Sequence, residues 1–179
     1  MHTEPMVRSI LLLGLGLGSS CASTSPAPTA VRGPGLEALA ALEGVWVEVG
    51  ENGASTGRVT NVFRTTAGGS AVSEVVFPGA PEEMLTVYQA GPGGLELTHY
   101  CAAGNAPRML LDDGSTADDL RFTCIGGVGL EDHATGHMHT GRIVVLGPDR
   151  LRTEWAYLEA GENTFTGVFE IQRVDAGAP

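Results

Sequence analysis

Ten short segments of strand-forming sequence, separated by turn residues at regular intervals, constrain the fold of this chain more than any other feature. Within each segment apolar and polar residues tend to alternate, and Gly, Pro, Asn or Asp stands between one segment and the next. This spacing is typical of an all-β sandwich or barrel. The segments are a first strand around Trp46 and residues 58–66, 70–77, 84–90, 95–101, 107–111, 120–125, 137–146, 151–158 and 164–173.

The connections between these segments are short, and several have sequences typical of hairpin turns. Gly-Pro-Gly-Gly at 91–94, Pro148-Asp149 and residues 161–163 each lie between two strands. Consecutive hairpins favour an up-and-down meander, and ten such strands close into a barrel, which removes the exposed edges. The stretch LEALAAL at 36–42 is good helix-forming sequence. We therefore predict an all-β, about ten-stranded up-and-down antiparallel barrel with a short N-terminal helix.

The N-terminus has the pattern of an export signal. Arg8 precedes an apolar run at 10–17, and small residues at 18–20 lead into Cys21. The run is too short to span a bilayer. A cysteine after small residues resembles a bacterial lipoprotein cleavage site, in which the thiol is acylated. The alternative is cleavage near Ala22, which leaves a soluble periplasmic or secreted protein.

These observations divide the chain into four parts. Residues 1–20 are the predicted signal peptide. Residues 21–35 are rich in Ser, Ala and Pro. This segment cannot bury enough apolar surface to fold, so we interpret it as a tether. Residues 36–174 are the predicted barrel domain, and 175–179 are a C-terminal tail. The expected location is the cell envelope, with a lipid anchor on Cys21 holding the domain to a membrane.

The charge of the chain excludes several partners and chemistries. The formal net charge is -11, with 21 acidic residues against 10 basic ones, all of them arginine. Nucleic acid is not an expected partner because phosphate backbones require a basic surface. Without lysine, the chain has neither a Schiff-base lysine nor the lysine of a phosphate-binding loop.

The two ends of the domain resemble lipocalin and fatty-acid-binding-protein barrels. The features that carry this resemblance are the opening helix, the Gly44-x-Trp46 pattern on the first strand and Arg173 on the last. The resemblance implies that Arg173 stacks on Trp46 and closes one end of the barrel.

A second resemblance covers residues 44–173. The segments GGSAVSEVVFPGAPEEMLTVY, LELTHYCAAGNAPRM, GHMH, RLRTEW and FEIQR are similar to those of an uncharacterised family of bacterial lipocalin-like (calycin-type) proteins. That family usually reads HYC, a glycine and then NQPRM, and this chain has Ala106 in place of the glutamine. The resemblance implies the barrel fold and a set of positions, and it implies no activity.

Histidines are the first candidate site residues. Strand periodicity places His99 on one face with Leu97, and His137 and His139 on the face of Ile143. If both faces point inward, His99, His137 and His139 could bind zinc, another metal or haem. The alternative is that they are hydrogen-bonded interior groups, and no glutamate follows His139 at the spacing of a cupin metal site.

A second set of polar residues surrounds the hairpin of His99. With the three histidines they would form a site for a small, partly apolar or amphipathic ligand at the barrel mouth. Arg108 could instead pair with Glu74 or Asp112, and the tyrosines could be ordinary packing residues. The set is Glu74, Tyr88, Tyr100, Asn105 and Arg108.

The remaining cysteines leave two questions open. Export favours a disulfide between Cys101 and Cys124, but an intervening strand at 107–111 would hold their backbones about 9.6 Å apart, beyond the roughly 7 Å that a bridge tolerates. A Cys101–His99 catalytic dyad is also unfavourable, because same-face neighbours on a strand are about 6.5–7 Å apart. No motif supports a named reaction, so enzymatic activity is not the preferred interpretation.

Four functions follow from this sequence, in order of preference. The first is a lipocalin-like barrel that binds a small, partly apolar ligand, and the second is a metal- or haem-binding barrel that uses His99, His137 and His139. The others are an enzyme on the same barrel and a structural envelope protein without a ligand. A cavity of about 300 Å³ or more would favour the first.

Overall fold

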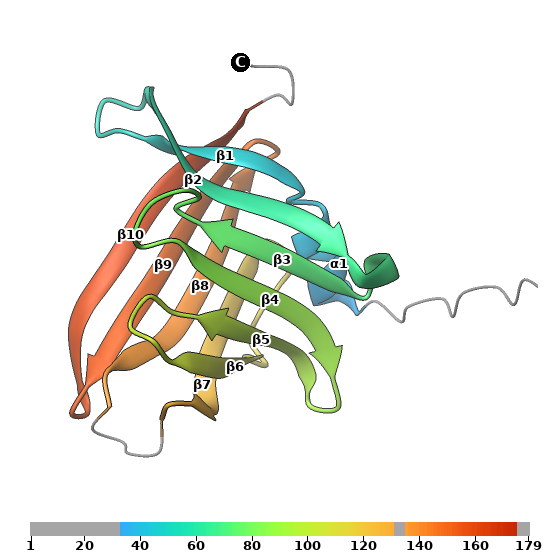
Figure 1. Ribbon diagram of the computed structural model, residues 1–179. Helices are drawn as coiled ribbons and strands as arrows, with labels where there is room; N and C mark the ends of the chain where they lie inside the picture. Colours follow the sequence, from blue (N-terminus) through green and yellow to red (C-terminus); the bar gives the residue numbers. More distant parts are fainter. Residues whose placement is uncertain (1–32, 131–134, 175–179) are drawn as a thin grey trace, which may run out of the picture.

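The computed structural model describes residues 33–130 and 135–174 as a closed antiparallel β-barrel. Each strand pairs with the next in sequence, and the first strand pairs with the last to close the barrel (Figure 1). One short helix precedes the first strand. The predicted ten-stranded up-and-down barrel with an N-terminal helix is confirmed.

The helix and strands have the following bounds. They are α1 (Pro34–Ala40), β1 (Gly44–Val49), β2 (Ser55–Thr66), the 3₁₀ turn η1 (Ala67–Gly69), β3 (Ala71–Val76), β4 (Met84–Gly91), β5 (Gly94–Tyr100), β6 (Ala106–Leu111), β7 (Asp119–Val128), β8 (His137–Gly147), β9 (Arg150–Glu159) and β10 (Glu162–Val174).

The helix begins earlier than its apolar pattern predicts. It starts at Pro34 rather than at Leu36, because proline fits the first helical turn, where its missing N–H would have no partner anyway. The predicted signal peptide and Cys21 lie outside the described residues, as do most of the tether and the C-terminal tail. Within the described ranges, no helix is long and apolar enough to cross a bilayer.

Helix α1 closes one end of the barrel. Leu36 and Leu39 are fully buried in the core, and the indole Nε1 of Trp46 donates a hydrogen bond to the carbonyl of Leu42 at 2.9 Å. Because the strands alternate in direction, the β2–β3, β4–β5, β6–β7 and β8–β9 connections lie at this same end. We call the opposite end, with the β1–β2, β3–β4, β5–β6, β7–β8 and β9–β10 connections, the far end.

Arg173 fixes the junction between α1 and β1. Its guanidinium carbon lies 4.5 Å from the centroid of the Trp46 ring, and the group donates hydrogen bonds to the carbonyls of Ala41 (3.0 Å) and Glu43. One planar side chain thus satisfies carbonyls beyond the end of the helix while it covers the indole. The predicted Trp46–Arg173 closure is confirmed.

Two of the irregularities in strand register near the far end lie on β7 and β8. On β7, Cys124 and Gly126 pair with successive residues of β6, which leaves Ile125 as an extra residue. On β8, Met138 and Thr140 pair with successive residues of β9, which leaves His139 as an extra residue. Such bulges break the regular alternation of faces, so side chains beyond them cannot be assigned by counting.

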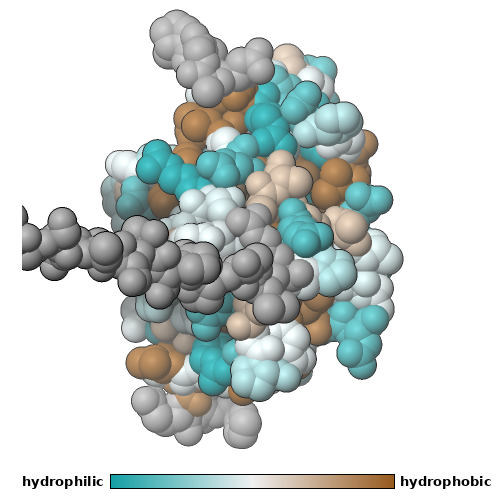
Figure 2. All heavy atoms as spheres, turned by 90° about the vertical axis from the view of Figure 1, so that its right-hand side faces the viewer, coloured by the Kyte–Doolittle hydropathy of each residue, from teal (hydrophilic) through white to brown (hydrophobic). Residues whose placement is uncertain are grey.

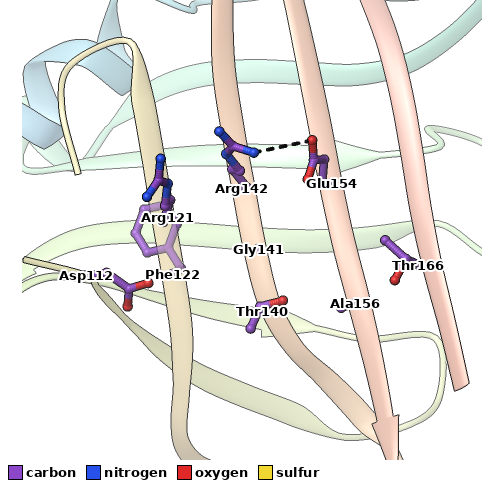
Figure 3. A pocket seen from close by; sticks show the side chains of 9 residues that line it. All are labelled: Asp112, Arg121, Phe122, Thr140, Gly141, Arg142, Glu154, Ala156 and Thr166. Atoms are coloured by element: carbon purple, nitrogen blue, oxygen red, sulfur yellow. Dashed lines mark ion pairs between the residues drawn. The ribbon is translucent and has the colours of Figure 1, made fainter. Parts of the chain in front are cut away.

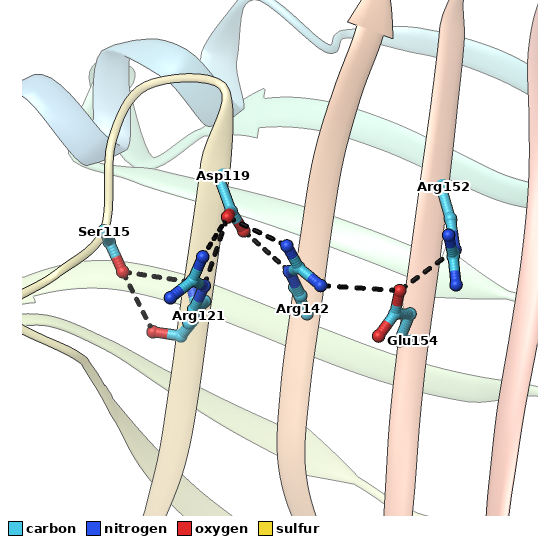
Figure 4. A network of polar contacts seen from close by, with 6 residues as sticks. All are labelled: Ser115, Asp119, Arg121, Arg142, Arg152 and Glu154. Carbon is cyan, nitrogen blue, oxygen red and sulfur yellow. Dashed lines mark hydrogen bonds and ion pairs between the residues drawn. The ribbon is translucent and has the colours of Figure 1, made fainter.

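The outer surface of β7, β8 and β9 carries a chain of ion pairs (Figure 4). The carboxylate of Asp119 pairs with Arg121 and, at 2.7 Å, with Arg142, and Glu154 pairs with Arg142 and Arg152. Seen from the side of α1, the surface is a mosaic of hydrophilic and hydrophobic residues (Figure 2). The candidate site residues lie instead inside the barrel and at its far end.

Candidate functional site: the barrel interior and its far end

Glu74 is the centre of a buried polar network. It lies on β3 with no exposed surface, and its two carboxyl oxygens accept hydrogen bonds of 2.5 Å from Asn61 Nδ2 and the Tyr88 hydroxyl. Burial raises the pKa of Glu74 to about 7, against the lowering effect of the two hydrogen bonds. Burial and the neighbouring Glu74 also raise the pKa of Tyr88 well above its usual range.

His99 has one satisfied and one unsatisfied ring nitrogen. Its Nδ1 shares a 2.9 Å hydrogen bond with Thr86 Oγ1, and its ring stacks on Trp155 with centroids 5.0 Å apart. The Nε2 atom is buried and has no hydrogen-bond partner among the described residues. Burial lowers the pKa of His99 to about 4, so the imidazole is neutral at neutral pH.

Strand register places these groups in one row across the barrel wall. Glu74 of β3 is directly opposite Thr86 of β4, and Thr86 is opposite His99 of β5. All three are at most 2% exposed. Because opposite residues share a face, the row points inward as a unit. Buried and more exposed residues alternate along β5, and Leu95, Leu97 and His99 are the buried ones. The imidazole of His99 is therefore inside the barrel, as the sequence predicts.

A cavity of about 200 Å³ lies beside His99, toward the far end of the barrel. Its wall is mainly apolar and aromatic, and the polar side chains are few. The residues that line it are Asn61, Val76, Phe77, Glu82, Met84, His99, Met138, Thr153, Trp155, Phe165, Gly167 and Phe169. The volume exceeds the ~150 Å³ of a cavity known to admit benzene and is below the ~300 Å³ expected for a drug-sized ligand. A haem group is larger still and does not fit this space.

Phe77 lies at the edge of the cavity in an unusual backbone conformation. Its φ of +52° is in the left-handed region, which costs a non-glycine residue roughly 1–2 kcal/mol. The ring packs edge-on against Phe169 of β10 (centroids 5.6 Å apart), and the guanidinium of Arg58 lies over it at 4.8 Å. Strain of this kind concentrates where a side chain must be aimed at a site.

A second group of side chains gathers where β7 ends and β8 begins. The ligand-type atoms of Cys124, His137 and His139 all lie within 4.8 Å of one another. His137 Nδ1 donates to the carbonyl of Thr135 at 2.7 Å, and His137 Nε2 lies 3.1 Å from His139 Nδ1. Burial and the neighbouring His137 lower the pKa of His139. A hollow of about 570 Å³ adjoins the group.

The structure therefore separates the three histidines that the sequence groups together. His137 and His139 are neighbours, but His99 lines the cavity instead, and their third companion is Cys124. The bulge at His139 is the reason, because it ends the alternation counted from Ile143 and lets Met138 line the cavity. A shared site of His99, His137 and His139 is not formed.

Cys101 and Cys124 are both free thiols. The predicted alternative of a disulfide is not what the structure shows, because β6 runs between β5 and β7 and keeps the two positions on strands that are not neighbours. The prediction that an intervening strand keeps the two cysteines apart is therefore correct.

The other predicted ligand residues are distributed over three places. Glu74 and Tyr88 are deep in the barrel, as described above. Asn105 is buried at the far end, where its Nδ2 donates to the Gly136 carbonyl at 2.8 Å. Tyr100 is 51% exposed, and the exposed Arg108 pairs with Glu96 at 2.7 Å rather than with Glu74 or Asp112. Arg108 and Tyr100 therefore take no part in the cavity.

A hollow on the outside of the barrel has a different character (Figure 3). It measures about 300 Å³ and is lined in part by Arg121, Arg142 and Glu154. Both arginines are already paired, Arg121 with Asp119 and Arg142 with Asp119 and Glu154. These hydrogen bonds hold the pKa of Asp119 well below its usual range. Ion pairs that are already formed leave little net charge to attract a ligand.

Sequence reasoning missed several residues of both sites. Trp155 could have been found, because the alternation of Leu151, Thr153 and Trp155 on one strand points all three inward. Cys124 was predicted only as a possible disulfide partner, and its place beside His139 follows from the β7–β8 register, in which Thr123 is opposite Thr140.

Comparison of the chain with protein-family models and with curated proteins finds no match.

Proposed function

We propose that this protein binds a small, compact, partly apolar molecule in the barrel cavity, with a hydrogen bond to His99. The observation that carries the proposal is the buried, unpartnered Nε2 of His99 beside an apolar cavity of about 200 Å³. Leaving a buried polar group unsatisfied costs roughly 1–3 kcal/mol. A ligand with one complementary polar group recovers that energy and specifies its own orientation.

The lining of the cavity indicates the class of ligand. Trp155, Phe77 and Phe169 offer aromatic surfaces, and the volume suits one ring with a small substituent better than a long acyl chain. Asn61 and Thr153 add further polar contacts in the same wall. A neutral ligand is favoured, because burial holds His99 uncharged.

The test compares p-cresol with toluene, two molecules of similar size that differ by a hydroxyl. Each is titrated into the full-length protein and followed by calorimetry and by the NMR signal of the Trp155 indole. We expect both to bind in the cavity, with cresol about tenfold tighter, which corresponds to about 1.4 kcal/mol for the added hydrogen bond. A phenol hydroxyl can donate or accept, so the preference does not depend on the tautomer of His99.

The matched variants are His99→Phe and Tyr100→Phe. His99→Phe keeps a ring against Trp155 but removes both nitrogens, so the preference for cresol should vanish while toluene still binds. Tyr100→Phe changes the next, exposed residue of β5 and should leave the preference intact. If neither probe binds saturably, or if cresol keeps its preference in His99→Phe, the proposal is wrong.

We also propose that the protein is exported and anchored to a membrane through an acylated Cys21. The support is the sequence pattern of Arg8, the apolar run at 10–17 and the small residues before the cysteine. Growth of an expressing bacterium with labelled palmitate should label the full-length protein but not Cys21→Ser. Export without label would instead favour the soluble periplasmic or secreted form.

A further inference from the structure

A cluster of one thiol and two imidazoles at the far end has the composition of a metal site. Its members are Cys124 on β7 and His137 and His139 on β8, two neighbouring strands of the barrel (Figure 1). The hollow beside it shares no lining residue with the cavity around His99. The cluster is therefore a separate site from the cavity of the proposed ligand.

The hydrogen bond from His137 Nδ1 to Thr135 leaves Nε2 as the ring nitrogen that can bind a metal. Because Nδ1 donates to the Thr135 carbonyl, the neutral ring carries its proton there, and the lone pair of Nε2 points toward the cluster. Metal-bound histidines ordinarily donate a hydrogen bond from the ring nitrogen that does not bind the metal, often to a backbone carbonyl. This hydrogen bond fixes the tautomer and the ring orientation.

The spacing of the ligand atoms is close to that of a tetrahedral site. Two nitrogens bound to one zinc ion at ~2.0–2.1 Å are about 3.3 Å apart, and His137 Nε2 and His139 Nδ1 are separated by 3.1 Å. The Cys124 sulfur is within 4.8 Å of both, so a side-chain adjustment of about 1 Å completes three corners of the tetrahedron. The same sulfur lies 3.5 Å from the backbone N–H of Gly126 and 3.7 Å from the Gly126 carbonyl oxygen.

The backbone is distorted at this place on both strands. The extra residues of the two bulges are Ile125, next to Cys124, and His139 itself. A regular ladder would place these side chains by simple alternation, whereas bulges re-aim side chains and are common beside functional sites. The regular β7–β8 pairing ends with Thr123 opposite Thr140, so the next residues on the two strands are Cys124 and His139, and both bulges lie beside them.

We propose that Cys124, His137 and His139 form a zinc-binding site whose fourth position no other described residue occupies. On binding, the thiol proton of Cys124 passes to solvent, and the Nδ1 proton of His139 moves to its Nε2, so that all three atoms present lone pairs. Thiolate and imidazole donors select zinc over magnesium or calcium. The fourth position faces the adjoining hollow of about 570 Å³ and would hold water or a small donor molecule.

The test titrates zinc and cobalt(II) into the reduced full-length protein. We expect one cobalt per chain, with visible bands of tetrahedral coordination and a thiolate-to-cobalt charge-transfer absorption, and displacement of cobalt by zinc. Cys124→Ser should abolish the charge-transfer absorption and weaken zinc binding at least 100-fold, and His137→Ala and His139→Ala should weaken it by a similar factor. Far-UV circular dichroism of each variant checks that the barrel is folded.

The matched control is Cys101→Ser, which removes the other described cysteine at the same end of the barrel. It should leave the absorption and the affinity unchanged. The proposal is overturned if Cys101→Ser reduces binding as much as Cys124→Ser does, if cobalt binds without the thiolate absorption, or if no stoichiometric metal is bound. His99→Phe should retain full zinc affinity, which separates this site from the cavity.

Discussion

Among single residues, the two buried titratable groups Glu74 and His99 are shifted toward their uncharged forms. Burial disfavours the charged form of both Glu74 and His99, and therefore moves their pKa values in opposite directions, up to about 7 for the carboxyl and down to about 4 for the imidazole. Between these two values both side chains are mainly neutral. A neutral interior suits a ligand of low polarity.

The two residues should affect stability in opposite ways as the pH changes. The contribution of Glu74 is complete below its unfolded pKa of 4.5 and is lost as the pH rises to about 7, whereas that of His99 is complete above 6.5 and is lost as the pH falls to about 4. Each shift corresponds to about 3 kcal/mol. In Glu74→Gln only the contribution of His99 remains, so the free energy of unfolding should fall steadily from pH 6.5 to 4.

Urea denaturation over this pH range measures the effect. The wild-type protein should show a much shallower slope between pH 4.5 and 6.5, because the two contributions offset each other there. His99→Gln should give the opposite slope to Glu74→Gln, with stability falling from pH 4.5 to 7. Glu96→Gln, on the outer surface, is the control. A Glu74→Gln protein with the wild-type slope would show that the carboxyl is not shifted.

At the scale of elements, α1 acts as a plug rather than as a surface helix. It has only seven residues, too few to be stable alone, so its stability comes from packing. Leu36 and Leu39 are inserted into the barrel core, and Arg173 holds the chain just beyond the helix. The closed end and the cavity thus lie at opposite ends of the same barrel.

Leu39→Ala should reveal the contribution of this plug. The side chain has no exposed surface, and its truncation leaves a void, so we expect the free energy of unfolding to fall by about 2–4 kcal/mol. The exposed Glu37→Ala on the same helix should change it by less than about 0.5 kcal/mol. Denaturation monitored by circular dichroism measures both, and equal effects would contradict the plug.

At the scale of the whole molecule, closure depends on the pairing of the two strands farthest apart in sequence. β1 pairs with β10 through residues 45–48 and 171–174, and this pairing leaves the barrel without a free edge. Unpaired edges of a sheet are templates for association with other chains. The ends of the domain thus protect each other.

A chain that ends at Gly161 tests the importance of closure. It lacks β10 and exposes the edges of β1 and β9, so we expect aggregation and the loss of cooperative thermal unfolding. Size-exclusion chromatography and circular dichroism are the measurements. Val168→Thr, at a 47% exposed position of β10, should stay folded and soluble. A monomeric, cooperatively unfolding truncated chain would show that closure is not required.

The class of fold and the closure of the barrel could be predicted from the amino-acid sequence. Strand alternation, turn residues and helix-forming segments are local properties, so the ten strands, their order and the interior position of His99 could be read from short stretches. The Trp46–Arg173 pair was also predictable, through a resemblance to known barrels. The pattern placed α1 within two residues of its true start.

The grouping of polar residues into sites, in contrast, depends on the folded arrangement of the strands. The faces of His137 and His139 depend on the bulge at His139, and a bulge is set by the partner strand rather than by the bulged segment alone. Because side chains alternate with a period of two, one extra residue transfers all that follow to the other face. For this reason His99 and the two other histidines, one group in the sequence, are two separate sites in the folded protein.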